Sequence, residues 1–434
     1  MARKLHLSPP IQSLSRRQFL EVAGGALALY TTSPLWLRLG AAGAEPAPAE
    51  GRKLLLLLLE GGNDGLNTVV PYGQTAYFEK RRTLAYKPEE ILKLGDSTMV
   101  GLAPTLPKLA KLYEARKVGL VQGVGYDKPN LSHFESMDIW QTGRPKHDLA
   151  TGWLGRYLDH TPSGASVVRA VAIGNRLPTV LTGAEQSGVA VPSFGGFTFF
   201  DGSDADPASE PHRLHEAFLA FADAPLTDGP AKALLASERA TVQAVRAIQK
   251  LGDPKAGEGH QPPPKQSKPP ATLADRVSMA VKLLSSDLGV EIAMVSLGGF
   301  DNHAAEKNNH PKLLTEVDNA IDRFMTDAAA TGKASDYLLM TFSEFGRRVE
   351  EDGSAGTDHG TAAPLFLVGD GVAGGLYGEQ PSLINLDNNK NLIRTVDFRE
   401  VYATVLDGWL RKVPAAEVLG TKPADGLHPV GFLR

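Results

Sequence analysis

The chain has 434 residues, no cysteine, and a formal net charge of −4 at pH 7. The absence of cysteine excludes disulfides, thiolate metal ligands and a cysteine nucleophile, so any metal has to be bound by His, Asp, Glu or Asn. The composition is that of a globular protein, and its acidic balance argues against general nucleic-acid binding.

Residues 1–44 are predicted to be a twin-arginine signal peptide. Arg16 and Arg17 precede a moderately apolar stretch, and the small residues 42–44 form a cleavage site. A membrane anchor and a chance arginine pair are the alternatives. We expect export to the periplasm or beyond, with no stable membrane span after signal removal. The remaining chain has 40 basic and 48 acidic residues, a net charge of −8, and residues 45–52 are a short linker.

Leu54–Thr68 is the first informative stretch of the exported chain. Six consecutive leucines are too few to span a membrane, and they are typical of a strand buried on both faces of a parallel sheet. Asp64 follows this strand within a glycine-rich turn. Ligands of open α/β sheets bind beyond the carboxyl ends of the strands, which makes Asp64 a candidate functional residue, although an ordinary turn fits the same letters.

A second apolar run, Val118–Val124, is followed by Ser132 and His133 ahead of a predicted helix at 134–141. Ser132 occupies a helix N-cap position, where serine is common for structural reasons. The same position exposes a hydroxyl beside helix N–H groups that attract anions. The local sequence leaves both roles open.

The proline-rich segment at about 252–270 has too few apolar residues to pack and is predicted to be a disordered insertion. A short strand is predicted at 167–173 and a helix at 397–409. After the proline-rich segment, two further strands are predicted at 291–297 and 336–342. Each strand ends in polar residues: Asp301 and His303 follow the first, whereas Glu344 and, in a later loop, His359 follow the second.

These polar strand ends predict one shared site, because parallel strands bring their carboxyl ends to the same edge of a sheet. Carboxylates and imidazoles without thiolates suit Zn²⁺, Mn²⁺ or a similar divalent ion, and one or two ions are expected. The alternative is that each side chain caps a turn or pairs with a nearby arginine. The candidate metal ligands are Asp64, Asp301, His303, Glu344 and His359.

The motifs GGNDGLNTVVPY, NLSHFESMDIWQTG, GGFDNH, TFSEFGRR and TDHG resemble the exported family known as domain of unknown function 1501. The order of the acids and histidines is also similar to that of the alkaline-phosphatase-like superfamily, which includes sulfatases. The resemblance extends from about Lys53 to His359 and beyond. It implies one α/β domain over residues 53–434, alkaline-phosphatase-like, with a central, mostly parallel sheet flanked by helices on both faces.

By this resemblance, Ser132 would match the hydroxyl nucleophile, and the five acids and histidines named above would match metal ligands. His133 or Arg347 could hold the transferred anion. The superfamily usually has Asp-His where this chain has Glu344 and Phe345, and His310 is an alternative to His303. A full two-metal site is therefore not required.

The sequence thus predicts an exported, metal-dependent hydrolase of phosphate or sulfate esters, acting on a small anionic substrate through Ser132 and His133. Two other functions remain open. One is a non-catalytic binding or structural protein that retains the fold with a degraded metal site. The other is a mutase or transferase that passes the group to a second hydroxyl.

Overall fold

The computed structural model describes residues 51–145, 149–162, 168–195, 231–252, 270–422 and 425–434. The predicted signal peptide and most of the linker and the proline-rich insertion lie outside these ranges. No helix among the described residues is both long enough and apolar enough to cross a membrane.

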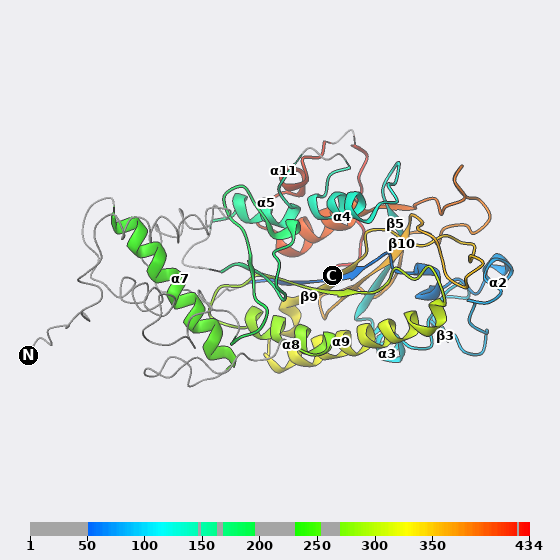
Figure 1. The fold of residues 1–434 in the computed structure, drawn as a ribbon, viewed down its shortest axis with the longest axis horizontal. Coiled ribbons are helices and arrows are strands. Elements are labelled where there is room, and N and C mark those ends of the chain that lie inside the picture. Colours follow the sequence, from blue (N-terminus) through cyan, green and yellow to red (C-terminus); the bar gives the residue numbers. More distant parts are fainter. Residues whose placement is uncertain (1–50, 146–148, 163–167, 196–230, 253–269, 423–424) are drawn as a thin grey trace, which may run out of the picture.

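A nine-stranded sheet forms the centre of the molecule (Figure 1). Its main path runs in the order β11 (Gly375–Tyr377), β5 (Val118–Gly125), β10 (Ala363–Val368), β9 (Tyr337–Phe342), β1 (Lys53–Glu60), β8 (Ile292–Gly298), β6 (Ala170–Ala172) and β7 (Val189–Ala190). The ninth strand, β12 (Val396–Asp397), pairs with β5. Strand β10 is antiparallel to both of its neighbours, whereas all other pairs are parallel.

Strand β1 lies between β8 and β9 and contributes to two hydrophobic cores. Leu55, Leu57 and Leu59 belong to one core, and the leucines between them belong to the other. This alternation is expected, because successive side chains of a strand point to opposite faces. The six leucines are buried on both faces for this reason.

Helices cover both faces of the sheet (Figure 1). On the face of Leu55 lie α2 (Thr75–Lys80), α3 (Pro107–Glu114), α8 (Leu273–Leu284) and α9 (His310–Ala330). On the opposite face lie α4 (His133–Thr142), α5 (Trp153–His160), α10 (Phe398–Thr404) and α11 (Ala415–Leu419). The predicted mostly parallel sheet with helices on both faces is confirmed.

The remaining elements are short or peripheral. A small sheet has the order β2 (Val69–Val70), β4 (Gly101–Leu102) and β3 (Leu92–Lys93). Helix α7 (Ala231–Gly252) lies at one end of the molecule. Single turns of helix are η4 (Gly65–Asn67), η5 (Thr179–Leu181), η6 (Glu306–Asn308), η7 (Ala334–Asp336) and η8 (Val405–Leu410).

Two sequence-based boundaries differ from the structure. The strand predicted at 167–173 is only Ala170–Ala172 among the described residues. The helix predicted at 397–409 is regular only to Thr404 and then widens into a π-helical turn.

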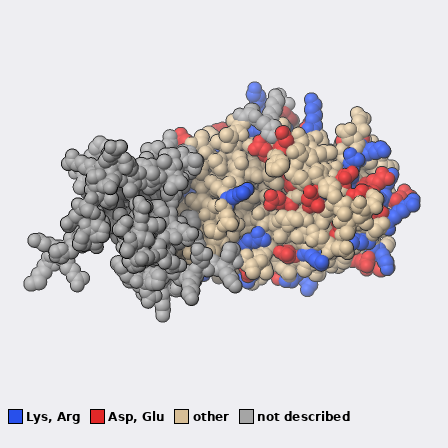
Figure 2. All heavy atoms as spheres, in the orientation of Figure 1, with Lys and Arg blue, Asp and Glu red and all other residues tan. Residues whose placement is uncertain are grey.

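On the face shown in Figure 2, acidic and basic side chains of the described part are interspersed.

Candidate metal centre

The site lies at the edge of the sheet where the parallel strands end. Strands β1, β5, β8 and β9 point the same way, so the segments that follow them meet at this edge. Strand β10 runs in the opposite direction and therefore begins here. The loop between β9 and β10 consequently stays at this edge, although His359 within it is 17 residues beyond the end of β9.

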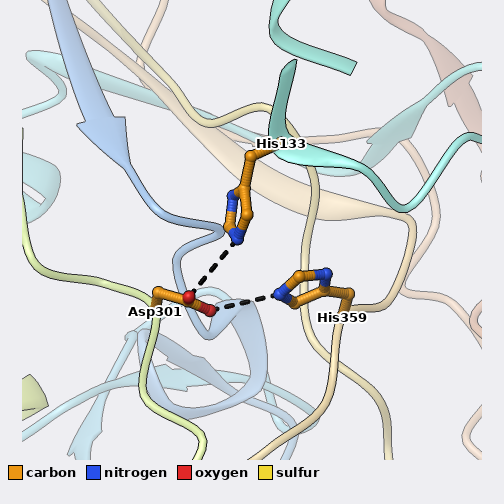
Figure 3. A group of neighbouring side chains, drawn as sticks. All are labelled: His133, Asp301 and His359. Atoms are coloured by element: carbon orange, nitrogen blue, oxygen red, sulfur yellow. Dashed lines mark hydrogen bonds and ion pairs between the residues drawn. The ribbon is translucent and has the colours of Figure 1, made fainter. Parts of the chain in front are cut away.

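Asp301 is the centre of a cluster of imidazoles (Figure 3). Its Oδ1 lies 2.9 Å from His303 Nε2 and 3.1 Å from His359 Nε2, and its Oδ2 lies 3.4 Å from His133 Nε2. The Nε2 atoms of His303 and His359 are 3.0 Å apart. His133 comes from the start of α4, whereas the other residues come from loops after β8 and β9. Three imidazoles thus present the same ring nitrogen to one carboxylate.

The opposite nitrogen of each imidazole faces an oxygen. His133 Nδ1 donates to Glu344 Oε1 at 2.7 Å, and His359 Nδ1 donates to the Leu131 carbonyl at 2.7 Å. His303 Nδ1 lies 3.5 Å from Asp358 Oδ1. An acceptor at Nδ1 keeps the ring proton there and leaves the Nε2 lone pair available to a ligand.

Arg347 and Phe345 form the base of the cluster. The Arg347 side chain is fully buried, and its guanidinium donates to Asp301 Oδ1 at 2.6 Å and to the carbonyls of Gly61, Gly62 and Thr357. The buried Phe345 ring packs 4.9 Å from His133 and 4.7 Å from His359 between centroids. Arg347 therefore links the loops that follow β1, β8 and β9 through its hydrogen bonds.

Arg347 also sets the charge of Asp301. Burial acts to raise the pKa of Asp301, but the hydrogen bond from Arg347 and the positive charge of Arg347 outweigh it and lower this pKa to about 2. Asp301 is consequently an anion at neutral pH. About half of its side chain is exposed to solvent, so a ligand can reach it.

The cluster fits a divalent cation. The buried Nε2 of His133 has no hydrogen-bond partner, although it points into the cluster. Ligand atoms of a tetrahedral ion with bonds of about 2.0–2.1 Å lie about 3.3 Å apart, which is close to the separations of 2.9–3.4 Å around Asp301. Imidazole nitrogen with one carboxylate is a donor set that suits Zn²⁺. Three of these residues, His133, Asp301 and His359, form a compact group of candidate ligands.

Glu344 lies beside the cluster but is already engaged by neighbours. Its side chain is almost fully buried, and Oε1 accepts hydrogen bonds from the Gly61 N–H at 2.9 Å and from His133. Its Oε2 lies 3.3 Å from the Ser343 hydroxyl, which donates to the Leu59 carbonyl at 2.6 Å. The structure therefore places Glu344 next to His133. Its assignment as a metal ligand stays a prediction.

Asp64 belongs to a separate buried network. It forms an ion pair with the fully buried Arg81, and Oδ1 accepts from the Leu66 N–H at 3.2 Å. Burial acts to raise the pKa of Asp64, but the charge of Arg81 and a hydrogen bond from Glu306 dominate and lower it far below its usual range. The contacts of Asp64 are thus with Arg81, Leu66 and Glu306, and its role as a metal ligand also stays a prediction.

Between the two histidines left open by the sequence, the structure brings His303 to Asp301. His310 is buried instead, with Nε2 2.9 Å from the Asn63 side-chain oxygen. Burial lowers the pKa of His310 to about 4, so it is neutral at pH 7. A second group, His303, Asp352 and Asp358, also has metal-binding side chains close together.

Ser132 is the N-cap residue of α4 and precedes His133. Its hydroxyl makes no capping hydrogen bond, while its backbone N–H donates to the Asn130 side chain at 2.8 Å. A helix start without a side-chain cap has N–H groups free to bind an anion. The structure thus places an uncommitted hydroxyl one residue from the cluster.

Sequence reasoning placed His133 in the site but did not foresee that it would face Asp301 as a candidate ligand. Its adjacency to Ser132 was visible in the sequence, yet its contact with Glu344 spans 211 positions. A tertiary contact of that length leaves no local pattern. The buried partner of Asp64, Arg81, is 17 positions away and was missed as well.

Comparisons with known proteins give one family and several distant structural likenesses. No curated protein matches the sequence. A protein in the alkaline phosphatase superfamily from Vibrio parahaemolyticus is 10% identical, with a TM-score of 0.36 and coverage of 80% of this chain and 70% of the other. A sulfatase from Pseudoalteromonas sp. is 12% identical, with a TM-score of 0.39 and coverage of 97% and 78%.

An alkaline phosphatase from the Antarctic bacterium TAB5 is also 12% identical, with a TM-score of 0.31 and coverage of 74% and 92%. These are distant likenesses, and nothing about the activity of this chain follows from them. The molecule is an α/β protein with a mostly parallel central sheet and a histidine-rich cluster at one edge. The chain belongs to the family described as protein of unknown function (DUF1501), whose model matches residues 120–410.

Proposed function

We propose that the protein is an exported, metal-dependent hydrolase of phosphate or sulfate esters, with Ser132 as nucleophile. The observation that carries the proposal is the convergence of three Nε2 atoms on the Asp301 carboxylate, with every Nδ1 facing an oxygen. Such an arrangement is expected of a cation site, because an acceptor at Nδ1 leaves each Nε2 lone pair available to a metal ion.

A divalent ion held by Asp301, His303 and His359 would supply Lewis-acid stabilisation of negative charge. The remaining chemistry belongs to the chain itself. Ser132 offers a hydroxyl that is not used for capping, and the positive end of the α4 dipole favours an anionic group beside it. Arg347 keeps Asp301 ionised and fixes its position.

In this mechanism, the Ser132 oxygen loses its proton to solvent and attacks phosphorus or sulfur, while the bond to the ester oxygen breaks and the leaving alcohol takes a proton from solvent. Water then attacks the serine ester, releases phosphate or sulfate, and returns a proton to the serine. The substrate class is proposed from the chemistry of the site: an exposed anion-binding helix start beside a cation suits a small tetrahedral anion. Both Asp301 and His303 are about half exposed, so a soluble ester can reach them.

One observation favours a second candidate, a non-catalytic binding protein with a reduced metal site. Asp64, expected by resemblance to bind metal, is neutralised by the buried guanidinium of Arg81. A carboxylate paired in this way needs no cation. Transfer of the group to another hydroxyl, as in a mutase, is a third outcome and would use the same residues.

The proposal is tested by metal analysis of protein purified without chelator, followed by assays with aryl phosphates and aryl sulfates. We expect about one equivalent of a divalent metal and turnover that is lost in Ser132→Ala. The matched control is Ser335→Ala, because Ser335 is an exposed serine that precedes β9, at the other edge of the sheet.

Less than one equivalent of metal with no turnover would support the binding protein instead. Equal activity in Ser132→Ala and the wild type would remove Ser132 from the mechanism. Adding an acceptor alcohol separates hydrolysis from transfer, because a transferase forms a new ester with the alcohol.

A further inference from the structure

The contacts of His133 distinguish it from an ordinary helix-start residue. It is the first residue of α4, and its Nδ1 donates to a carboxylate that lies 211 positions away. Its Nε2 is buried, lacks a hydrogen-bond partner, and lies 3.4 Å from Asp301 Oδ2. Leaving a buried polar atom unpaired costs about 1–3 kcal/mol, so such an atom usually has a partner that completes it.

The hydrogen bonds of Glu344 fix the orientation of the His133 imidazole. Its backbone follows β9, and its side chain is held by the Gly61 N–H and lies beside the Ser343 hydroxyl. With Oε1 accepting both from Gly61 and from His133 Nδ1, the carboxylate cannot turn without losing both hydrogen bonds. A carboxylate held in this way fixes the ring proton on Nδ1 and directs the Nε2 lone pair into the cluster.

The rings of His133 and His359 are also packed against each other. Their centroids are 4.4 Å apart at an interplanar angle of 75°, and both rings contact Phe345. His133 is thus held by a hydrogen bond at one nitrogen and by ring packing on its faces. Its free nitrogen points at the carboxylate that His359 also contacts (Figure 3).

We propose that His133 binds the metal ion through Nε2 together with Asp301 and His359, and that Glu344 is its positioning residue. This inference rests on the metal dependence in the proposed function and deepens it. Glu344 was expected to be a metal ligand and His133 a catalytic residue. Here His133 is the ligand, and Glu344 orients it through the hydrogen bond to Nδ1.

A consequence concerns Ser132, the residue before His133. A ligand at the first position of α4 ties the start of this helix to the metal centre. The hydroxyl of Ser132 and the positive end of the α4 dipole are therefore held close to the metal centre by the same helix. The nucleophile is positioned by its neighbour in the chain.

The experiment measures Co²⁺ binding by the metal-stripped, exported protein, using the visible absorption of bound Co²⁺. We expect His133→Ala to weaken Co²⁺ binding by more than about 100-fold, and Glu344→Gln by about 10- to 100-fold with an unchanged spectral shape, because outer partners of metal-bound histidines have effects of this size. The control is His428→Ala, because His428 is exposed and contacts Glu400 only through its backbone N–H.

His133→Ala could also weaken Co²⁺ binding by disturbing the start of α4. A variant that leaves a cavity for a free imidazole tests this. His133→Gly with added imidazole should recover the Co²⁺ affinity and the spectrum of the wild type, whereas imidazole should not help His428→Gly. Circular dichroism of the metal-free variants checks that the fold is retained.

If the wild type binds Co²⁺ and His133→Ala binds it equally well, the inference is overturned while the proposed function stands. If Glu344→Gln changes the spectrum as the loss of a ligand would, Glu344 is a ligand and its positioning role is wrong. If the wild type binds no Co²⁺ or other divalent ion, both proposals are overturned.

Discussion

Two acid-containing clusters lie where the strands of the sheet end, and they differ in how their charge is balanced. Around Asp301, three imidazoles face a carboxylate that is about half exposed. Around Asp64, Arg81 and Glu306 satisfy a carboxylate that is almost fully buried. The first cluster has donor atoms left for a cation, and the second does not need one. Residue type alone therefore does not distinguish a candidate metal site from a buried ion pair.

The difference can be tested most strongly at Arg81. We expect Arg81→Ala to lower the free energy of unfolding by about 3–5 kcal/mol, because it leaves Asp64 as an uncompensated buried charge. Urea unfolding monitored by circular dichroism measures this loss. Arg323→Ala is the control, since its exposed pair with Asp327 should contribute only about 0.3–0.5 kcal/mol. Equal losses in the two variants would contradict the structural role of Arg81.

The second prediction concerns Asp301. We expect Asp301→Asn to weaken metal binding by more than about 100-fold, since even outer-sphere changes cost about 10- to 100-fold. The loss of unfolding free energy should be smaller than for Arg81→Ala, because Asp301 is half exposed. Metal titration and urea unfolding of the same preparation measure both effects. Metal affinity that survives in Asp301→Asn would exclude Asp301 as a ligand.

The third prediction uses pH to probe the buried network. Burial and the nearby charge of Asp64 raise the pKa of Glu306 to about 9, so the folded state keeps a proton that the unfolded chain loses above about pH 4.5. The free energy of unfolding should therefore fall as pH rises from 7 to 9, by up to about 1.4 kcal/mol per pH unit. His310, whose pKa is lowered to about 4, contributes the opposite slope only below about pH 6.5.

Glu306→Gln is the variant that isolates this effect. A neutral amide retains a donor for Asp64 and cannot lose a proton, so the decline between pH 7 and 9 should disappear. Urea unfolding in the presence of a chelator at pH 7, 8 and 9 measures the slope. An identical slope in the wild type and Glu306→Gln would show that Glu306 is already ionised in the folded protein.

The smallest expected effect separates a capping serine from a catalytic one. The Ser132 hydroxyl makes no capping bond, so Ser132→Ala should change the free energy of unfolding by less than about 0.5 kcal/mol. Thr272 forms a capping box with Asp275, and Thr272→Ala should cost about 1 kcal/mol. Thermal unfolding compares the two. A loss of similar size in both variants would favour the structural role of Ser132.

Much of the fold could be predicted from local pattern. The six leucines of β1 indicated a strand buried on both faces, and the alternating burial in two cores confirms this. The strand ends that carry Asp301 and Glu344 were also placed correctly in the chain. Boundaries were less accurate where tertiary packing decides them, as at η8, where the helix after Thr404 widens.

The candidate site was predictable in its composition and not in its internal arrangement. Asp301, His303 and His359 do meet, because parallel strands share an edge and β10 begins at it. The orientation of His133 by Glu344 and the pairing of Asp64 with Arg81 had no local signal. Both depend on side chains that meet only after the sheet has formed.

The amino-acid sequence by itself determined the periodicity, the apolar strands and the polar residues at their ends, because these depend on neighbours along the chain. Only the tertiary structure decided which acid faces imidazoles and which faces a guanidinium. The physical reason is that a buried carboxylate needs a compensating positive charge or hydrogen bonds, and packing determines which partner lies within reach. Asp64 and Asp301 have the same chemistry in isolation, and their different partners set them apart.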